Sequence, residues 1–206
     1  MLKLWGRVNS INVMKALWCL DELGIDYERA DAGMEYGIVD DPAYRIMNPN
    51  GRVPVLQDGD FYLWESNVVV RYLSAIYGEG TLCPCDPKAR ALADQWMEWQ
   101  HTTAVPDITF LFWGLIRNKT ENQAPDLVSA ATARVAETWL ILDRHLDGKE
   151  IVMGDTFTMA DIPLGACIWR YANLPLERPT MPNVDRWHES LKKRKGFQER
   201  VMLPLT

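Results

Sequence analysis

The spacing of apolar residues in the first part of the chain switches repeatedly between that of strands and that of helices. Alternation over residues 2–5 predicts a strand, whereas apolar side chains every three or four positions over residues 13–23 predict a helix that ends at Gly24. A second strand is expected over residues 25–30, followed by a short helix over residues 42–47. The chain therefore begins as alternating strands and helices.

Two short apolar runs, over residues 53–56 and 61–63, then flank an Asp-Gly dipeptide. They predict an antiparallel hairpin, because glycine accepts the positive φ that a tight turn requires. Pro54 cannot donate to a sheet and marks the start of the first of these strands as unusual. With an apolar helix over residues 66–77, the order β-α-β-α-β-β-α predicts an α/β domain over residues 1–78, its helices packed on a small mixed sheet.

The second part of the chain is predicted to be entirely helical. Glycine and proline concentrate in residues 79–87, which we take as a linker, and residues 88–206 follow as an all-helical domain. Pro106 is expected to kink the first of its helices. Thr158 and Asp161 have the spacing of a capping box at a later helix start. Helices are expected over residues 89–117, 130–146, from about 158, and 183–195.

Charge and cysteine usage narrow the class of function. The net charge of −6 argues against nucleic-acid binding, which normally needs a basic face. The basic run 192–195 is interpreted as the solvated end of the last helix. No apolar run has the length of a membrane span, and the first residues already alternate like a strand. The four cysteines lack metal-ligand spacing, so we expect no metal, no membrane partner and a cytoplasmic location.

The hairpin and the helix after it have the features of a peptide-binding site. The backbone at Val53, next to Pro54, can pair with an extended ligand. The helix that starts at Ser66 offers free N–H groups and a positive dipole end to a carboxylate. Glu65, directly before it, is either a surface acid or a partner for a ligand ammonium group. Together these residues predict a site for a small acidic peptide.

Ser10 lies between the first predicted strand and the first predicted helix. Its position suits a helix N-cap, and it also suits a hydroxyl donor at a site shared with Val53 and Ser66; the two roles are compatible. The positive end of a helix favours a thiolate over a thiol. Asn12 is a second possible donor, or an ordinary residue of the first helical turn.

Several cations and aromatic residues leave two interpretations open. Arg7 and Lys15 either raise the local positive potential or are solvated charges. Arg117 interrupts an apolar run, as a helix-end cation or as an anchor for an anionic co-substrate. Trp113, on the same predicted helix, belongs either to the core or to a pocket.

These motifs together resemble those of the cytosolic glutathione S-transferases. The matching segments are Ser10 after the first strand, Asn48-Pro49 leading to Val53-Pro54, Glu65-Ser66-Asn67 before Arg71-Tyr72-Leu73, and Thr158 to Asp161. Their order extends over essentially the whole chain, and the opening around Ser10 is similar to that of bacterial serine-type, theta/phi-like members. The resemblance implies a thioredoxin-like N-terminal domain, an all-helical C-terminal domain and a homodimer.

The resemblance also implies roles for individual residues. It implies a cis bond before Pro54, so that the Val53 backbone pairs with the cysteine of glutathione. Glu65 and Ser66 would hold the γ-glutamyl end, and Ser10 would donate a hydrogen bond to the sulfur. The basic residues that plant-type members use on the glycine carboxylate are absent, which leaves Arg52 as the candidate. Trp113 and Arg117 would line the pocket for the electrophile.

The function expected from this resemblance is that of a glutathione transferase involved in detoxification, with glutathione as co-substrate. It would activate the glutathione thiol as a thiolate for attack on a small electrophile. Two alternatives remain open. One is a glutathione-dependent dehalogenase or disulfide reductase that acts on a small anionic substrate, and the other is a non-catalytic interaction module of the same fold.

Overall fold

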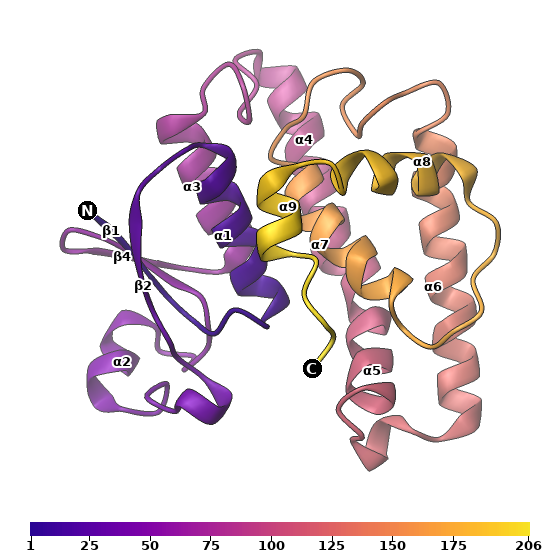
Figure 1. Ribbon diagram of the computed structural model, residues 1–206, viewed down its shortest axis with the longest axis horizontal. Coiled ribbons are helices and arrows are strands. Elements are labelled where there is room, and N and C mark those ends of the chain that lie inside the picture. Colours follow the sequence, from indigo (N-terminus) through magenta and orange to yellow (C-terminus); the bar gives the residue numbers. More distant parts are fainter.

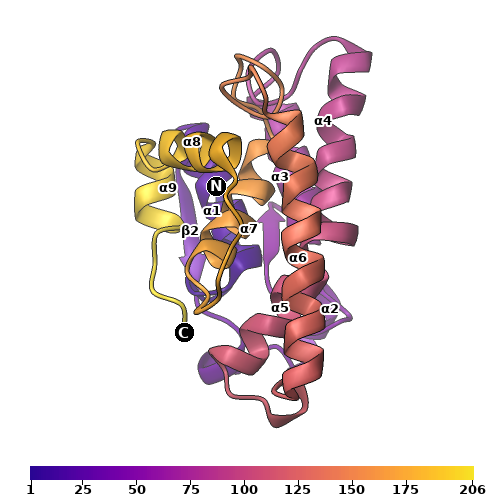
Figure 2. The ribbon, with the colours of Figure 1, turned by 90° about the vertical axis from the view of Figure 1, so that its right-hand side faces the viewer.

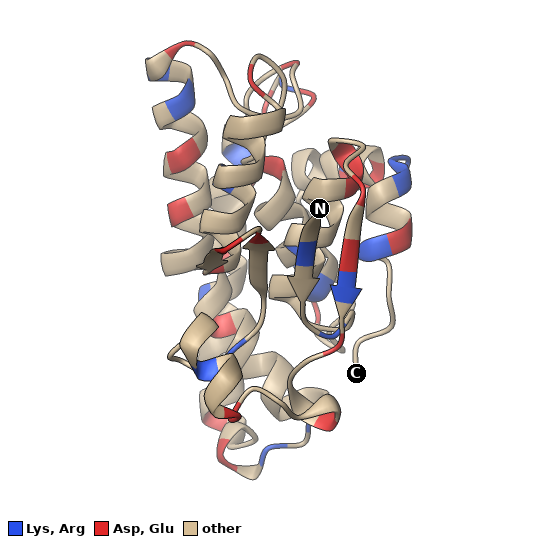
Figure 3. Ribbon diagram, turned by 90° about the vertical axis from the view of Figure 1, so that its left-hand side faces the viewer, with Lys and Arg blue, Asp and Glu red and all other residues tan.

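The computed structural model describes all residues 1–206, and its first part is built on a four-stranded mixed sheet (Figure 1). The strand order is β2-β1-β3-β4. β1 (Leu2–Trp5) pairs in parallel with β2 (Tyr27–Ala30) and antiparallel with β3 (Val55–Asp58). β3 forms the predicted hairpin with β4 (Phe61–Trp64), and the strands lie side by side in Figure 3.

Helices cover both faces of this sheet. Leu4 and Leu56 point to the face on which α1 (Ile11–Glu22) and α3 (Ser66–Tyr77) pack, within the main hydrophobic core. Val55 points to the other face, where it joins Tyr44 of α2 (Pro42–Met47) in a small second cluster. The period-2 alternation of strand side chains produces this division. The result is the predicted thioredoxin-like arrangement.

The second part of the chain consists of helices only. α4 (Pro87–Trp99), α5 (Val105–Leu115) and α6 (Pro125–His145) are followed by α7 (Asp161–Ala172), α8 (Pro182–Leu191) and α9 (Lys195–Arg200). Figure 2 shows α6 as a long helix alongside α5, with α8 beside its upper part. Short 3₁₀ turns occupy Met34–Tyr36 and Thr120–Asn122. No helix is both long enough and apolar enough to span a membrane.

Two of the helix predictions in this part need correction. The long helix expected over residues 89–117, with a kink at Pro106, is a continuous helical run from α4 to α5 that contains a π-helical turn at Gln100–Ala104, directly before the segment in which Pro106 lacks the N–H that the preceding turn would need. The single helix expected over residues 183–195 is divided into α8 and α9. The basic run falls across that break instead of ending a helix, and Arg194 in it pairs with Glu22 of α1 at 2.7 Å.

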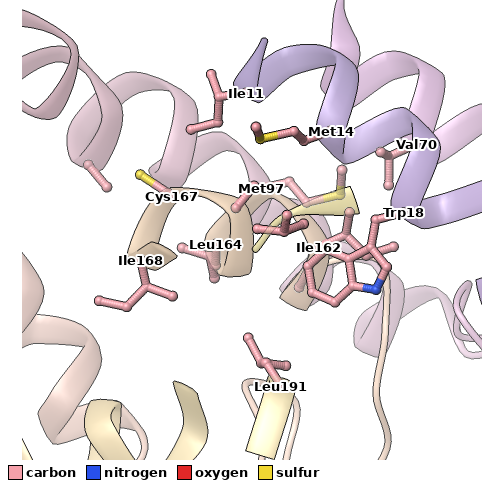
Figure 4. Close-up of a cluster of buried hydrophobic side chains, with 14 of the residues drawn as sticks. Ile11, Met14, Trp18, Val70, Met97, Ile162, Leu164, Cys167, Ile168 and Leu191 are labelled. Carbon is pink, nitrogen blue, oxygen red and sulfur yellow. The ribbon is translucent and has the colours of Figure 1, made fainter. Parts of the chain in front are cut away.

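The two parts share one hydrophobic core, centred on the contact between α1 and α7. Trp18 of α1 is completely buried, and Figure 4 shows it among the buried hydrophobic side chains. It packs against Phe197 and close to Gly165. A Cβ atom at Gly165 would lie 2.7 Å from the Trp18 ring, so glycine allows α1 and α7 this close approach. The helical part therefore holds the start of α1, which borders the site described below, in a fixed position.

The capping box before α7 is confirmed. Thr158 Oγ1 accepts a hydrogen bond from the Ala160 N–H at 3.3 Å, and Asp161 Oδ2 accepts one from the Thr158 N–H at 3.0 Å. Asp161 Oδ1 also accepts hydrogen bonds from the Val152 N–H at 3.1 Å and from Trp187 Nε1 at 3.0 Å. This buried carboxylate thus connects four segments of the helical part.

Candidate functional site

A cleft of about 490 Å³ lies between the sheet and the helical part. The sheet side contributes the β1–α1 connection, the start of α1 and the loop before β3. The helical side contributes the π-helical turn, α5, the residue Arg117 beyond it and Arg170 of α7. Of the predicted site residues, those that line the cleft are Ser10, Asn12, Arg52, Val53, Trp113 and Arg117.

Ser10 stands at the N-cap position of α1 with extended backbone dihedrals, but its side chain makes no capping hydrogen bond. Its hydroxyl is therefore not used by the helix, although the residue is largely buried against the cleft. A hydroxyl at the positive end of a helix can donate to an anion placed in the cleft. Ser10 thus occupies the N-cap position and still has its hydroxyl available for a ligand.

Behind Ser10, a buried polar network connects α1 with the start of α3. Ser66 Oγ donates to Asn12 Oδ1 at 3.2 Å. Lys15 Nζ donates to Ser66 Oγ at 3.4 Å and to Asn67 Oδ1 at 3.1 Å. Asn67 Nδ2 in turn donates to Gln100 Oε1 at 3.2 Å, which brings in the π-helical turn of the helical part.

Lys15 is the residue in this network whose role the sequence did not reveal. Its side chain is buried, with 1% of the residue exposed, and burial lowers the pKa of Lys15 to about 8. All of its hydrogen-bond partners are neutral side chains of Ser66, Asn67 and Gln100. The available signal was its place on an apolar helix, where a solvated charge has little room. The interpretation of Lys15 as a solvated charge was wrong.

The segment before β3 contains the cis peptide bond that the resemblance implied. The Val53–Pro54 peptide bond is cis, and because β3 begins at Val55, the Val53 backbone lies outside the strand ladder. Tyr44 and Asn48 fix this segment by donating to the Arg52 carbonyl at 2.9 and 2.8 Å.

Three predicted residues, Pro54, Glu65 and Ser66, do not line the cleft. Ser66 reaches it through the hydrogen bond to Asn12, which does line it. Glu65 is exposed and adopts a φ of 69°, a left-handed conformation that is rare for residues other than glycine and that is often found at functional sites.

The helical wall of the cleft combines aromatic rings with arginines. Phe112 and Trp113 belong to α5, and the Arg117 guanidinium lies 5.4 Å from the centre of each ring. Arg170 of α7, only 8% exposed, lies 3.9 Å from the Phe112 ring centre. Arg117 directly follows the C-cap of α5, and its Nε is buried without a hydrogen-bond partner. Sequence reasoning missed Arg170, although a charge within the apolar α7 was a signal.

The structure contains no group of three or more histidine, cysteine or acidic residues placed to hold a metal ion. The four cysteines are free thiols, and burial raises the pKa of Cys19 to about 12 and that of Cys167 to about 11. Such thiols stay protonated and pack as apolar groups.

Comparisons with known proteins agree with this geometry. Residues 1–75 match the family described as glutathione S-transferase, N-terminal domain. The chain is 38% identical to glutathione S-transferase GstB of Escherichia coli K12, over 100% of both sequences, and 31% identical to glutathione S-transferase 3 of Zea mays, over 97% of this chain and 93% of the relative. The chain belongs to the glutathione S-transferase family.

A solved structure of the glutathione S-transferase family shows the same fold throughout. It is the theta-class enzyme of Xanthomonas axonopodis pv. citri with glutathione bound, which is 42% identical to this chain. The match has a TM-score of 0.94 and covers 100% of this chain and 99% of the other. The predicted family and the predicted fold class, a thioredoxin-like domain followed by a helical domain, are both confirmed.

Proposed function

We propose that this member of the glutathione S-transferase family activates the thiol of glutathione in the cleft and transfers glutathione to a small electrophile, with Ser10 as the donor to the sulfur. The observation that carries the proposal is the Ser10 hydroxyl, which borders the cleft at the start of α1 and caps no helix. A free cysteine thiol has a pKa near ~8.5, so little of it is ionised at neutral pH. One hydrogen bond and the helix end lower that pKa by roughly 1–2 units.

The rest of glutathione is assigned to the sheet side of the cleft. The backbone of Val53, outside the ladder of β3, is proposed to pair with the cysteine of glutathione. The γ-glutamyl end is assigned to Glu65 and to Ser66 at the N-terminus of α3, with the buried charge of Lys15 behind them. Arg52, which is exposed at the rim, is assigned to the glycine carboxylate. Asn12 is the second candidate donor to the sulfur.

The electrophile is assigned to the opposite wall, where Trp113 and Arg117 line the cleft. We also propose that the protein is a cytoplasmic detoxifying homodimer. Large apolar side chains are exposed on consecutive elements of one region, β4, α3 and α4, which suits an interface with a second copy. The exposed residues are Phe61, Tyr62, Trp64, Val68, Ile76 and Leu92. The mass in solution, measured by light scattering, checks this; a monomer at micromolar concentration would contradict it.

Replacing the Ser10 hydroxyl tests the proposed activation. Ser10→Ala is expected to lower turnover by roughly ten- to a thousand-fold, the range for losing one donor to a developing anion. The ultraviolet absorbance of the thiolate, followed against pH with glutathione bound, should titrate about one unit higher than in the wild type. Glutathione affinity, measured by calorimetry, should change much less, because the peptide contacts are elsewhere.

Ser74→Ala is the matched control for this variant. Ser74 is an equally buried serine on α3 whose hydroxyl contacts Cys19 Sγ at 3.8 Å and does not line the cleft. Its turnover and thiol titration should equal those of the wild type. If Ser10→Ala behaved like Ser74→Ala, Ser10 would have no part in activation and Asn12 would be tested next. Failure to consume thiol with any electrophile would instead favour the non-catalytic module.

A further inference from the structure

Three guanidinium groups line the cleft near enough for their charges to act on one another. Arg7 comes from the β1–α1 connection, Arg117 from the segment after α5, and Arg170 from α7. Burial, with a smaller part from the charges of Arg117 and Arg7, lowers the pKa of Arg170 to about 10. Burial and the charge of Arg117 likewise lower the pKa of Arg7. The three groups therefore act on one another as like charges.

None of these arginines has an acidic partner. Elsewhere in the protein, buried or half-buried arginines pair with carboxylates, as Arg194 does with Glu22 and Arg200 with Asp21. No carboxylate lies within ion-pair distance of Arg7, Arg117 or Arg170. The Nε atoms of Arg7 and Arg117 are buried without any hydrogen-bond partner. Glu35 raises the pKa of Arg7 through its charge alone, without forming an ion pair.

The residues that line the cleft as a whole also include cations without acidic residues to balance them. It contains five lysine and arginine residues and no aspartate or glutamate, in a protein whose net charge is −6. Arginine cannot shed its proton to relieve such repulsion. A buried cation without a partner is costly, so a set of them around a cavity is the arrangement expected where a ligand supplies the negative charge. The five cations are Arg7, Lys15, Arg52, Arg117 and Arg170.

The way in which two of the arginines are held leaves their donor edges available. Arg170 and Arg117 both lie over the Phe112 ring, at 3.9 and 5.4 Å from its centre, and Arg117 also lies 5.4 Å from that of Trp113. Contact with an aromatic face orients a guanidinium plane without using its N–H groups. Those N–H groups remain for a planar anion, and a carboxylate matches their fork geometry.

The proposed function leaves this part of the cleft unoccupied by glutathione. The proposed function assigns its two carboxylates to the start of α3 and to Arg52, both on the sheet side, and its sulfur to Ser10 between the walls. Arg117 and Arg170 belong to the opposite, helical wall. An anion at these two residues would therefore belong to the second substrate, and Arg7, on the connection that leads to Ser10, lines the same cleft.

We infer that the second substrate is a small electrophile that carries a carboxylate next to its reactive carbon, and that Arg117 and Arg170, helped by Arg7, bind this carboxylate. The inference rests on the proposed function. With a 2-halocarboxylate, the thiolate sulfur forms a bond to the carbon that carries the halogen, and the carbon–halogen bond breaks with its electron pair on the departing halide. The thiol proton has already passed to solvent, so no oxidant or reductant is needed.

The experiment compares chloroacetate with chloroacetamide, which differ chiefly in charge. For each compound, kcat/KM is divided by the rate constant of the reaction with free glutathione, and the ratio of the two results measures preference for the anion. The wild type is expected to prefer chloroacetate by at least about ten-fold, the effect of a charge-assisted hydrogen bond. Raising the ionic strength from 50 to 300 mM should reduce this preference, because salt screens the arginines.

Arg117→Gln should reduce the preference by roughly ten- to a hundred-fold, since it removes a charged bidentate donor and leaves a shorter, neutral amide. Lys119→Gln is the matched control. Lys119 also lies over the Trp113 ring, at 4.5 Å, but it is exposed and does not line the cleft, so its variant should retain the full preference. If Arg170→Gln fails to fold because the residue is buried, Arg117→Gln and the salt dependence still decide.

The outcomes separate the inference from the function on which it rests. Conjugation of chloroacetamide without preference for chloroacetate would overturn the inference and leave the transferase intact. So would an Arg117→Gln variant that raises the KM for glutathione and affects both electrophiles equally, because the arginine would then bind glutathione. If neither compound reacts, and Ser10→Ala also leaves thiol ionisation unchanged, the proposed function itself fails.

Discussion

The two ends of α7 each bury a charged side chain, and they treat it differently. At the N-terminal end, Asp161 is completely buried, and its two carboxylate oxygens accept hydrogen bonds from two backbone N–H groups and the Trp187 indole. At the C-terminal end, Arg170 contacts the face of Phe112 and pairs with no acid. A buried charge that the protein itself satisfies holds structure together, whereas a buried charge left with free donors faces a place where a ligand binds.

A third buried group shows that missing partners alone do not mark a ligand site. His188 is 4% exposed, and its Nε2 has no hydrogen-bond partner, yet it packs between Trp169 and Phe197 and does not line the cleft. Burial lowers the pKa of His188 to about 4, so the ring is neutral at physiological pH. Arginine cannot become neutral in this way, so an unpaired buried arginine indicates a ligand site more strongly than an unpaired buried histidine does.

The largest effect is expected at the satisfied end of α7. Asp161→Ala leaves three buried donors without an acceptor and should lower the free energy of unfolding by about 3–5 kcal/mol. Chemical denaturation measures this change. Thr158→Ala, which removes only the acceptor for the Ala160 N–H, should cost about 1 kcal/mol. If Asp161→Ala lost no more than Thr158→Ala, the contrast between the two ends would be undermined.

The comparison is sharpened by the pH dependence of His188. Because its folded-state pKa lies below the unfolded value, the unfolded chain binds the extra proton between about pH 6.5 and 4. Stability is therefore lost as the pH falls through this range, by up to about 3 kcal/mol. Burial raises the pKa of Asp161 to about 6, which acts in the opposite direction, so the measurement is the difference between wild type and His188→Leu across pH. If the free energy of unfolding changed equally with pH in both proteins, His188 would not be the group that titrates.

The smallest effect is expected at Lys15. This buried charge is intermediate between Asp161 and Arg170, because it has hydrogen-bond partners but all of them are neutral. Lys15→Met removes the positive charge behind the proposed γ-glutamyl site and should weaken glutathione binding about ten-fold, or 1.4 kcal/mol. The free energy of unfolding should stay equal or rise, because a buried ammonium without an anion is costly. Calorimetry and denaturation test the two parts, with the exposed Lys88→Met as control. Lost stability with unchanged affinity would make Lys15 structural.

Strong local patterns allowed much of the fold to be predicted from the sequence. The helices Pro42–Met47 and Ser66–Tyr77 have the predicted bounds, since proline or serine begins each one and an apolar stripe follows. The break between α8 and α9 was not predictable, because it accompanies a long-range contact of Arg194 with Glu22. The expected helix start at residue 130 was also late: α6 begins at Pro125, before its apolar spacing becomes regular.

The candidate site was predictable where a residue type and its place in the chain order carry the signal. Ser10, Val53 and Arg117 line one cleft, as expected. Arg7 and Arg170 were different, because a sequence shows that a residue is charged but not whether an acid lies opposite it. That information belongs to tertiary structure, and here it separates a binding site from an ordinary ion pair.

The π-helical turn at Gln100–Ala104 has a consequence for how this cleft can change through insertion and deletion. A π turn holds one residue more than an α turn, so the extra residue widens one turn while the turns after it keep their phase. Deleting one residue there would convert it into an α turn and leave α5, with Trp113, facing the cleft as before. Deleting a residue within α5 itself would instead rotate every position after it by about 100°. A single codon lost from the π turn can thus be absorbed without changing the face presented to the second substrate.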